Sequence, residues 1–300
     1  MATKTLIAAV VLCAASGSAA AQPAQKITIG IYAPSVEFGT AQARLAYVQG
    51  LAKAIEQNTG IKTDAQSYAS LGALKSDAVD FAIIDGQCYA TNLSYKLLAA
   101  ANIGGGTSRG WALYSNAGDL SALKGKKLAI MNTGCNDAGF VDNAMLESEV
   151  DPAHFGSRVG KPDISAAIAE VASYKTAQAV FAPSGSTKGL TKLFDTGSVP
   201  NPAFVDVGGK LPAATVDKVS SAVLGYGGGG AIASWQKGDT GNYRGLASRL
   251  GRVTKQGVLV APELVRIDAK DVLSEPATLK DTAMADVRHH FLRSPGARME

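Results

Sequence analysis

Cys88 and Cys135 are the side chains of this sequence with the greatest capacity for chemistry. Cys88 lies in the segment DGQCY (85–89) and Cys135 in NTGCND (132–137), and each segment follows an apolar run. Open α/β sheets hold their ligands on loops at the carboxyl ends of strands. If the two apolar runs are inner strands of two α/β lobes, the cysteine pair marks the mouth of a cleft.

Such a pair permits three kinds of chemistry. A disulfide is the usual outcome for two cysteines in an oxidising compartment. Together with Met131, the two sulfurs could instead form a soft site for copper(I) or another thiophilic metal. A cysteine nucleophile would need a base within reach, and of the three histidines only His154 is a candidate. The three interpretations differ in the redox state that they require of the sulfurs.

Small and polar residues form two turns that read as helix starts, NTGCND (132–137) and PSGSTKG (183–189), the second before residues 190–194. Backbone N–H groups at a helix start can hold an anion without a basic side chain, although ordinary N-capping explains the same residues. Asp85 and Asp137 repel an anion and would suit a ligand with an amine beside its anionic group, or a metal ion. Three aromatic side chains near strand ends could line the cleft or belong to the core: Phe38, Tyr89 and Trp111.

Several common functional signatures are missing from the sequence. It contains no GxxxxGK[ST], HExxH, GxSxG or EF-hand pattern. Gly225, Gly227 and Gly230 match GxGxxG but follow a helical segment, whereas the dinucleotide fingerprint follows a strand. The 29 Lys and Arg exceed the 25 Asp and Glu only slightly, with no basic run longer than Lys126-Lys127. We therefore expect no cofactor and no nucleic-acid partner.

Residues 1–21 are predicted to be a secretory signal peptide. Lys4 supplies the positive charge, residues 6–15 the apolar core, and Ala19-Ala20-Ala21 the cleavage site. The apolar core is too short for a bilayer span, which needs about 20 residues. We expect cleavage before Gln22 and export of an unanchored protein to the periplasm.

Apolar patterns predict strands and helices in alternation, which is the α/β signature. The first series is strand 27–32, helix 40–57, strand 61–67, helix 71–76 and strand 79–84, and the second is strand 127–131, helix 137–149, edge strand 158–159, helix 164–173 and strand 176–181. Beyond them we predict a helix at 213–224, strands at 258–260 and 265–267, and a helix at 279–292. Extended segments 109–115 and 203–207 bracket the second series, as expected for two hinge crossovers between lobes.

Three stretches resemble a known family: ITIGIYAPSVEFGTAQARLAYVQGLAKAIEQNTGIKT (27–63), LKSDAVDFAIIDGQCYA (74–90) and LKGKKLAIMNTGCNDAGF (123–140). They are similar to the phosphate/phosphonate-type periplasmic substrate-binding proteins of ABC importers. The resemblance implies the α/β type II periplasmic binding protein fold, in which each lobe is a mostly parallel sheet flanked by helices. We place lobe 1 at 22–112 plus 206–300 and lobe 2 at 113–205.

The resemblance also implies a function and a site. It implies a non-enzymatic monomer that captures a small anionic solute, of the phosphonate or phosphate kind, between its lobes and delivers it to the membrane subunit of an ABC importer. In the family a turn rich in serine and threonine, after the LKGKK strand, holds the anionic head group, and here that turn is NTGCN (132–136). The expected ligand-binding residues are Ser35, Glu37, Phe38, Asp85, Cys88, Tyr89, Asn132, Thr133, Cys135, Asn136, Asp137 and Ser184.

The resemblance places one cysteine on each lobe. A disulfide between them would cross the gap between the lobes and oppose its opening. We therefore expect two free or conditionally paired thiols near the ligand, and neither a catalytic residue nor a metal in the leading interpretation.

Overall fold

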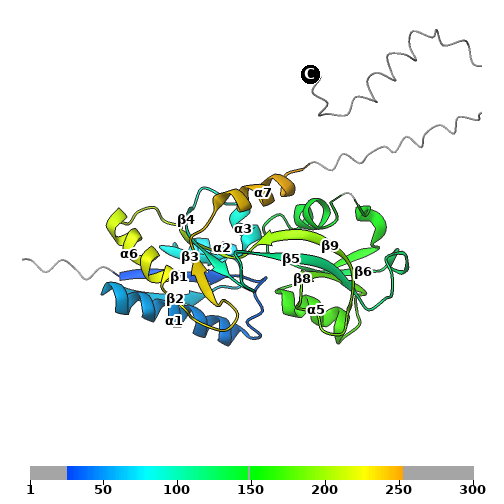
Figure 1. Ribbon diagram of the computed structural model, residues 1–300, viewed down its shortest axis with the longest axis horizontal. Coiled ribbons are helices and arrows are strands. Elements are labelled where there is room, and N and C mark those ends of the chain that lie inside the picture. The colour runs from blue at the N-terminus through cyan, green and yellow to red at the C-terminus, as the bar shows by residue number, and fades with distance from the viewer. Residues whose placement is uncertain (1–25, 148, 253–300) are drawn as a thin grey trace, which may run out of the picture. The chain divides into compact units, whose positions relative to one another are not determined.

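The computed structural model describes residues 26–147 and 149–252, which form two sheets with helices packed on them (Figure 1). The predicted signal peptide and the elements predicted at 258–260, 265–267 and 279–292 lie outside the described residues. No helix within the described residues is long and apolar enough to cross a membrane. The predicted lobe boundaries stay a prediction, and below the two lobes are defined by their sheets.

The first lobe is built on a six-stranded sheet. In spatial order its strands are β11 (Ser234–Gln236), β4 (Lys96–Asn102), β10 (Ala203–Asp206), β3 (Phe81–Ile84), β1 (Lys26–Tyr32) and β2 (Lys62–Ser67). Its helices are α1 (Ala41–Thr59), α2 (Leu71–Ser76), α3 (Gly86–Ala90) and α6 (Ala213–Leu224). The carboxyl ends of β1 and β3 face the second lobe, so the loops that follow them lie between the lobes (Figure 1).

Helix α1 shows how the local sequence fixes an element of this lobe. Its buried side chains recur at spacings of three and four residues: Tyr47, Val48, Leu51, Ala52 and Ile55. The hydroxyl of Thr40 accepts a hydrogen bond from the N–H of Ala43 and so caps the start of the helix. Gly60 ends it at φ 72°, in the left-handed region that glycine adopts without strain.

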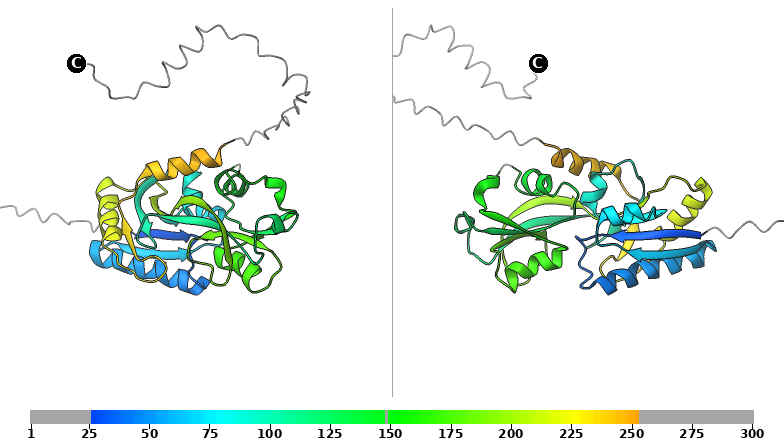
Figure 2. Two further views of the ribbon diagram at one scale, coloured as in Figure 1. Left: turned by 45° about the vertical axis from the view of Figure 1, so that its right-hand side comes forward. Right: turned by 180° about the vertical axis from the view of Figure 1, so that it is seen from behind.

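The second lobe is built on a five-stranded sheet. Its strands in spatial order are β7 (Ser157–Lys161), β6 (Lys127–Met131), β8 (Ala179–Pro183), β5 (Ser108–Ser115) and β9 (Thr191–Pro200). Its helical elements are η1 (Ser121–Leu123), α4 (Asp137–Gly139), the π-helical segment η2 (Phe140–Met145), η3 (Pro152–His154) and α5 (Ile164–Ala172). The chain passes between the sheets from β4 to β5 and returns from β9 to β10, as Figure 2 shows from two sides.

The observed sheets are mixed rather than mostly parallel. The pairs of β1 with β2 and β3 are parallel, and so are the pairs of β6 with β7 and β8. Strands β4, β5, β9 and β10 pair antiparallel because they belong to the segments that leave one lobe and return to it. The single helix predicted at 137–149 is α4 followed by η2, whose wider turns bury Phe140, Val141, Ala144 and Met145 together.

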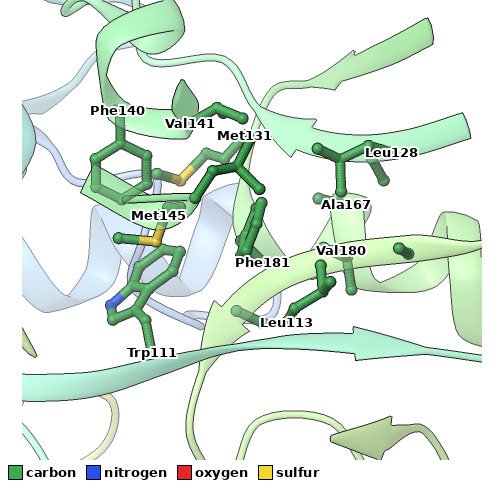
Figure 3. Close-up of a cluster of buried hydrophobic side chains, with 14 of the residues drawn as sticks. Trp111, Leu113, Leu128, Met131, Phe140, Val141, Met145, Ala167, Val180 and Phe181 are labelled. Carbon is green, nitrogen blue, oxygen red and sulfur yellow. The ribbon is translucent and has the colours of Figure 1, made fainter. Parts of the chain in front are cut away.

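The core of the second lobe is apolar and aromatic. Leu128 and Met131 of β6 lie over Leu113, Val180 and Phe181 of the neighbouring strands (Figure 3). Figure 3 also shows Trp111 beneath η2, where its ring meets that of Phe140 edge to face at 5.4 Å. The lobe therefore buries its own hydrophobic core, as an ordinary domain does.

Helix α7 (Thr240–Leu250) belongs to neither sheet and contacts both lobes. In Figures 1 and 2 it is the orange helix that lies beside α3. Its Tyr243 ring packs against Tyr89 of α3 at 4.7 Å, while Leu246 and Leu250 enter the core of the second lobe. The side chains of Asn136 and Asn143 donate to the carbonyl of Leu250 at the end of the helix. Helix α7 is thus a further connection between the lobes.

Gly86 allows α3 to approach the crossover between β9 and β10. A Cβ atom on Gly86 would lie 2.0 Å from the carbonyl oxygen of Pro200. We expect Gly86→Ala to push α3 away and to lower the free energy of unfolding by about 1–3 kcal/mol in urea denaturation. Gly245→Ala in α7 is the control, because nothing lies within 4 Å of its Cβ position; there we expect a gain of up to about 1 kcal/mol. A loss at Gly245 as large as that at Gly86 would contradict the steric explanation.

Candidate functional site

Cys88 and Cys135 form a disulfide between the lobes, with a sulfur–sulfur distance of 2.05 Å. Cys88 lies in α3, the helix that follows β3 in the chain, and Cys135 lies in the loop between β6 and α4. The expectation of free thiols is therefore wrong, and the conditional pairing that was the other expectation stays a prediction. Each lobe contributes one of the two cysteines, as predicted, and both side chains are buried.

The disulfide also overturns the other two interpretations of the pair. Sulfurs bonded to each other are neither thiolate ligands nor a nucleophile. Met131 is buried in the core of the second lobe (Figure 3), so it does not belong to a metal site. His154 has its Nε2 at 2.9 Å from the carbonyl oxygen of Leu120, in a different part of that lobe. Within the described residues no cluster of three or more His, Cys, Asp or Glu could hold a metal.

The loop after β6 wraps around the carboxylate of Asp137. That carboxylate accepts hydrogen bonds from the backbone N–H of Thr133 at 3.0 and 3.1 Å, from Thr133 Oγ1 at 2.5 Å and from the N–H of Gly134 at 2.9 Å. Gln87 of the first lobe reaches across the gap, and its Nε2 donates to Asp137 Oδ1 and to the carbonyl of Cys135, both at 2.9 Å. The two lobes are therefore joined at this point by hydrogen bonds as well as by the disulfide.

A second charged group lies where β1, β3 and β5 come together. Asp85 is buried and accepts from the N–H groups of Ser35 and Gln87. Burial raises the pKa of Asp85, while the hydrogen bonds from Ser35 and Gln87 and the charge of Arg109 act against that rise. Burial lowers the pKa of Arg109, because it disfavours the charged guanidinium, while the negative charges of Asp85 and Glu37 act to raise that pKa. Arg109 of the second lobe thus lies near two acidic groups of the first lobe, Asp85 and Glu37.

Three further hydrogen bonds join the lobes. Tyr32 donates its hydroxyl to the carbonyl of Thr133 at 3.0 Å, and burial with the nearby charges of Asp85 and Asp137 raises the pKa of Tyr32 to about 12. Arg109 donates to the carbonyl of Ser35 at 3.2 Å. The backbone N–H of Ile164 at the start of α5 donates to the carbonyl of Pro34 at 3.0 Å. The loops at the carboxyl ends of β1, β3 and β6 thus meet the opposite lobe directly.

The remaining residues predicted from the sequence lie around this contact or away from it. Glu37 is exposed, and Phe38 packs against Tyr47 of the first lobe with ring centroids 5.6 Å apart. Tyr89 packs on α7 and donates its hydroxyl to the carbonyl of Tyr95. Asn132 is exposed and its backbone N–H donates to Lys161, whereas Asn136 binds the end of α7. Of the twelve predicted residues the structure gathers six at the inter-lobe contact: Ser35, Asp85, Cys88, Thr133, Cys135 and Asp137.

The turn at 183–189 does not begin a helix, so the interpretation of Ser184 as part of a helix start is wrong. The residues after it form β9, which pairs with β5 along its whole length. Ser184 is exposed and its backbone N–H donates to the carbonyl of Gly110, which leaves it beside the strand that carries Arg109. Pairing with β5 has overridden the local sequence preference.

Sequence reasoning missed four residues that hold the site together: Tyr32, Gln87, Arg109 and Asn201. Gln87 lies inside the DGQCY segment, between Gly86 and Cys88. A polar side chain at that position could have indicated a buried hydrogen bond. Arg109 begins an extended apolar segment, where a charge is unexpected. Asn201 lies between two prolines, and no local pattern indicates that its side chain binds the other crossover.

Solved structures identify the fold. The sequence itself matches no family model and no curated protein. The binding protein of an ABC phosphonate transporter from Pseudomonas aeruginosa is similar in structure, with a TM-score of 0.58 at 14% identity over 74% of this chain and 84% of that one. The chain has the type II periplasmic binding protein fold.

Two other proteins share the type II fold with this chain. PhnD1 from Prochlorococcus marinus, in complex with methylphosphonate, has a TM-score of 0.60 at 12% identity over 77% of this chain and 98% of that one. A Xanthomonas citri protein bound to ATP has a TM-score of 0.55 at 12% identity over 75% of this chain and 97% of that one. The predicted fold class is confirmed, with mixed sheets as the difference.

Within this type II fold several buried polar side-chain atoms have no hydrogen-bond partner among the described residues. Gln87 Oε1 is one, and Trp111 Nε1 and Thr187 Oγ1 in the second lobe are two others. Buried polar groups without a partner are uncommon and often mark a place for water, an ion or a ligand. Four cavities lined by described residues lie elsewhere, the largest with about 630 Å³ between α1 and β2, and none of these four includes a predicted site residue.

Proposed function

We propose that this chain is an exported, monomeric solute-binding protein that holds a small solute between its lobes and presents it to an ABC importer. The observation that carries the proposal is the meeting of carboxyl-end loops from two sheets around buried polar groups, in a fold that solved importer binding proteins share. The proposal is for binding without turnover. Positions 1–21 supply the signal for export to the periplasm.

We infer that the solute carries an anionic group. The loop after β6 already binds a carboxylate, that of Asp137, with two backbone N–H groups and a hydroxyl. Arg109 adds a positive charge on β5, the second strand along from β6 in the sheet. Two proteins of the same fold hold phosphorus oxyanions, methylphosphonate in one and ATP in the other. A phosphonate, phosphate or similar oxyanion is the class of solute that fits these donors.

A panel of solutes tests the proposal. The melting temperature of the purified chain from Gln22 is measured with phosphonates, phosphate, sulfate, nucleotides, amines and metal salts. Each compound that raises it is then titrated by calorimetry. A solute at one hundred times its Kd stabilises the folded state by about 2.7 kcal/mol, so we expect one class to raise the melting temperature by about 5 °C or more. Absence of any shift or heat across the whole panel would contradict solute capture.

Arg109→Gln tests whether the solute binds at the inter-lobe site or through the overall charge of the surface. We expect this variant to weaken binding of an anionic hit by about tenfold or more, because the favourable charge is lost inside a partly buried site. Arg158→Gln is the matched control. Arg158 lies on the edge strand β7 of the second lobe and forms an ion pair with Asp142 of η2. An equal effect of both variants would show that overall charge rather than the cleft binds the solute.

A further inference from the structure

The carboxylate of Asp137 is bound as an anionic ligand would be. Its partners are two backbone N–H groups, one hydroxyl and one side-chain amide, and no cation is among them. Charge-assisted hydrogen bonds of this kind are short and strong. They come from both lobes, because Thr133 and Gly134 belong to the loop after β6 and Gln87 belongs to α3.

The loop backbone is shaped for this arrangement. Gly134 has φ 71° and Asn136 has φ 58°, so the chain turns through the left-handed region twice within three residues. The turn directs the N–H groups of Thr133 and Gly134 toward the same carboxylate. The side chain of Asp137 lies where these donors converge, and its place is one that an oxyanion of similar size could take.

Gln87 provides an independent sign that this place is built for a ligand. The side chain is 1% exposed, its Nε2 donates to Asp137 and Cys135, and its Oε1 has no hydrogen-bond partner within residues 26–147 and 149–252. A buried acceptor without a partner has lost its hydration with no hydrogen bond in return, so it destabilises the protein that carries it. Oε1 belongs to the same carboxamide as Nε2 and can only accept, so a ligand that pairs with it has to bring an O–H donor, as a hydrogen phosphate or a monoprotonated phosphonate does.

We propose that Asp137 is an internal ligand, whose carboxylate occupies an oxyanion position in the loop after β6 until a free oxyanion displaces it. The proposal rests on the proposed function, because it concerns the same site, and it adds the group with which a solute must compete. Asp137 thereby sets the affinity for oxyanions: the stronger its own hold on the loop, the weaker the binding of phosphate or methylphosphonate to the wild-type chain.

Removal of the carboxylate tests this assignment by refilling the position from solution. In Asp137→Ala the four donors lose their acceptor, so we expect formate and inorganic phosphate to raise its melting temperature by about 4 °C or more, against about 1 °C or less for the wild type, at equal ionic strength with chloride as reference. We also expect calorimetry to give a Kd for phosphate at least about tenfold lower in the variant.

Two further variants separate the internal ligand from other effects. Asp137→Asn fills the same space without a charge, so we expect it to lose stability and to gain nothing from formate. Asp119→Ala is the matched control, because Asp119 also accepts two hydrogen bonds, from Ser121 and Ala122, but on an exposed turn. Equal rescue of Asp119→Ala would overturn the proposal, and so would unchanged phosphate affinity in Asp137→Ala. If Asp137→Ala does not fold, Asp137→Ser carries the same measurements.

The outcome is distinct from that of the solute panel. Gain of phosphate binding by Asp137→Ala supports the internal ligand even if the wild type binds nothing in the panel, in which case Asp137 and not a solute fills the position in the wild type. A wild-type chain that binds a solute, together with an Asp137→Ala variant that gains no anion binding, leaves solute capture in place and overturns the internal ligand.

Discussion

Loss of the disulfide is expected to lower the free energy of unfolding by about 4 kcal/mol, because the cross-link closes a loop of 47 residues and so restricts the unfolded chain. The variant is Cys88→Ser combined with Cys135→Ser, compared with the wild type in urea without reductant. Both cysteines are buried, at 0% and 3% exposure, so the serine hydroxyls add a desolvation cost to the lost cross-link.

The same variant is expected to change the motion of the lobes. The disulfide joins α3 to the loop after β6 and is therefore a covalent connection in addition to the two crossovers. A hinge rotation that separates these loops has to break it or distort it. We expect small-angle scattering to show a larger radius of gyration for the double serine variant than for the oxidised wild type, in the absence of solute.

Reduction provides the control for both effects. We expect thiol titration of the chain from Gln22 to find no free thiol in urea until a phosphine reductant is added, and two thiols afterwards. The reductant should lower the stability of the wild type and leave the double serine variant unchanged. Two titratable thiols in the untreated protein would contradict the disulfide, and equal stability of oxidised and reduced protein would contradict its role.

Much of the fold follows from local sequence patterns. Strand β6 and helices α2 and α6 begin and end where the apolar patterns predict. The spacing of buried residues in α1 and the continuous apolar run of β3 are enough to identify those elements. Each of these elements buries one face or both faces, so its apolar residues recur at the spacing of a helix or a strand and can be recognised in the sequence.

The elements that were missed depend on partners distant in the sequence. Strand β4 contains three consecutive alanines, and alanine is a poor strand former; it is a strand because β10 and β11 pair with its two edges. Strand β9 has a polar sequence that suits a turn or helix, but it lies along the whole of β5. The position of α7 follows from contacts with α3 and η2 that no local pattern encodes.

The candidate site was predictable in its loops but not in its contacts. The DGQCY and NTGCND segments meet as the positions of their strands predict. The pairing of their cysteines depends on a Cα–Cα distance of 5.0 Å, which only the relation of the two lobes decides. That Asp137 contacts a ligand stays a prediction, and its hydrogen bonds to Thr133, Gly134 and Gln87 were not foreseen. The sequence does not indicate which side chains of one lobe contact which groups of the other, because these contacts depend on how the two lobes meet.

Asn201 holds the two crossovers to each other. It lies between Pro200 and Pro202 on the return path, and it is 1% exposed. Its Nδ2 donates to the carbonyl oxygens of Ala101 at 3.2 Å and Gly106 at 2.8 Å on the outgoing path, and its Oδ1 accepts from Arg109 Nε at 2.8 Å. One side chain thus satisfies three buried or partly buried groups at the base of the hinge.

We expect Asn201→Ala to lower the free energy of unfolding by about 3 kcal/mol, because these three groups lose their partner where water replaces it poorly. Asn201→Asp should be destabilising as well, since its carboxylate keeps the bond to Arg109 but faces two carbonyl oxygens. Asn58→Ala is the control: Asn58 also donates to a carbonyl, that of Ala54, but on the exposed end of α1, and we expect a change within about 0.5 kcal/mol there. Urea denaturation measures all three variants. A cost at Asn201 no larger than that at Asn58 would mean that the crossovers are held by their backbone alone, through bonds such as that from Asn201 N–H to the carbonyl of Thr107.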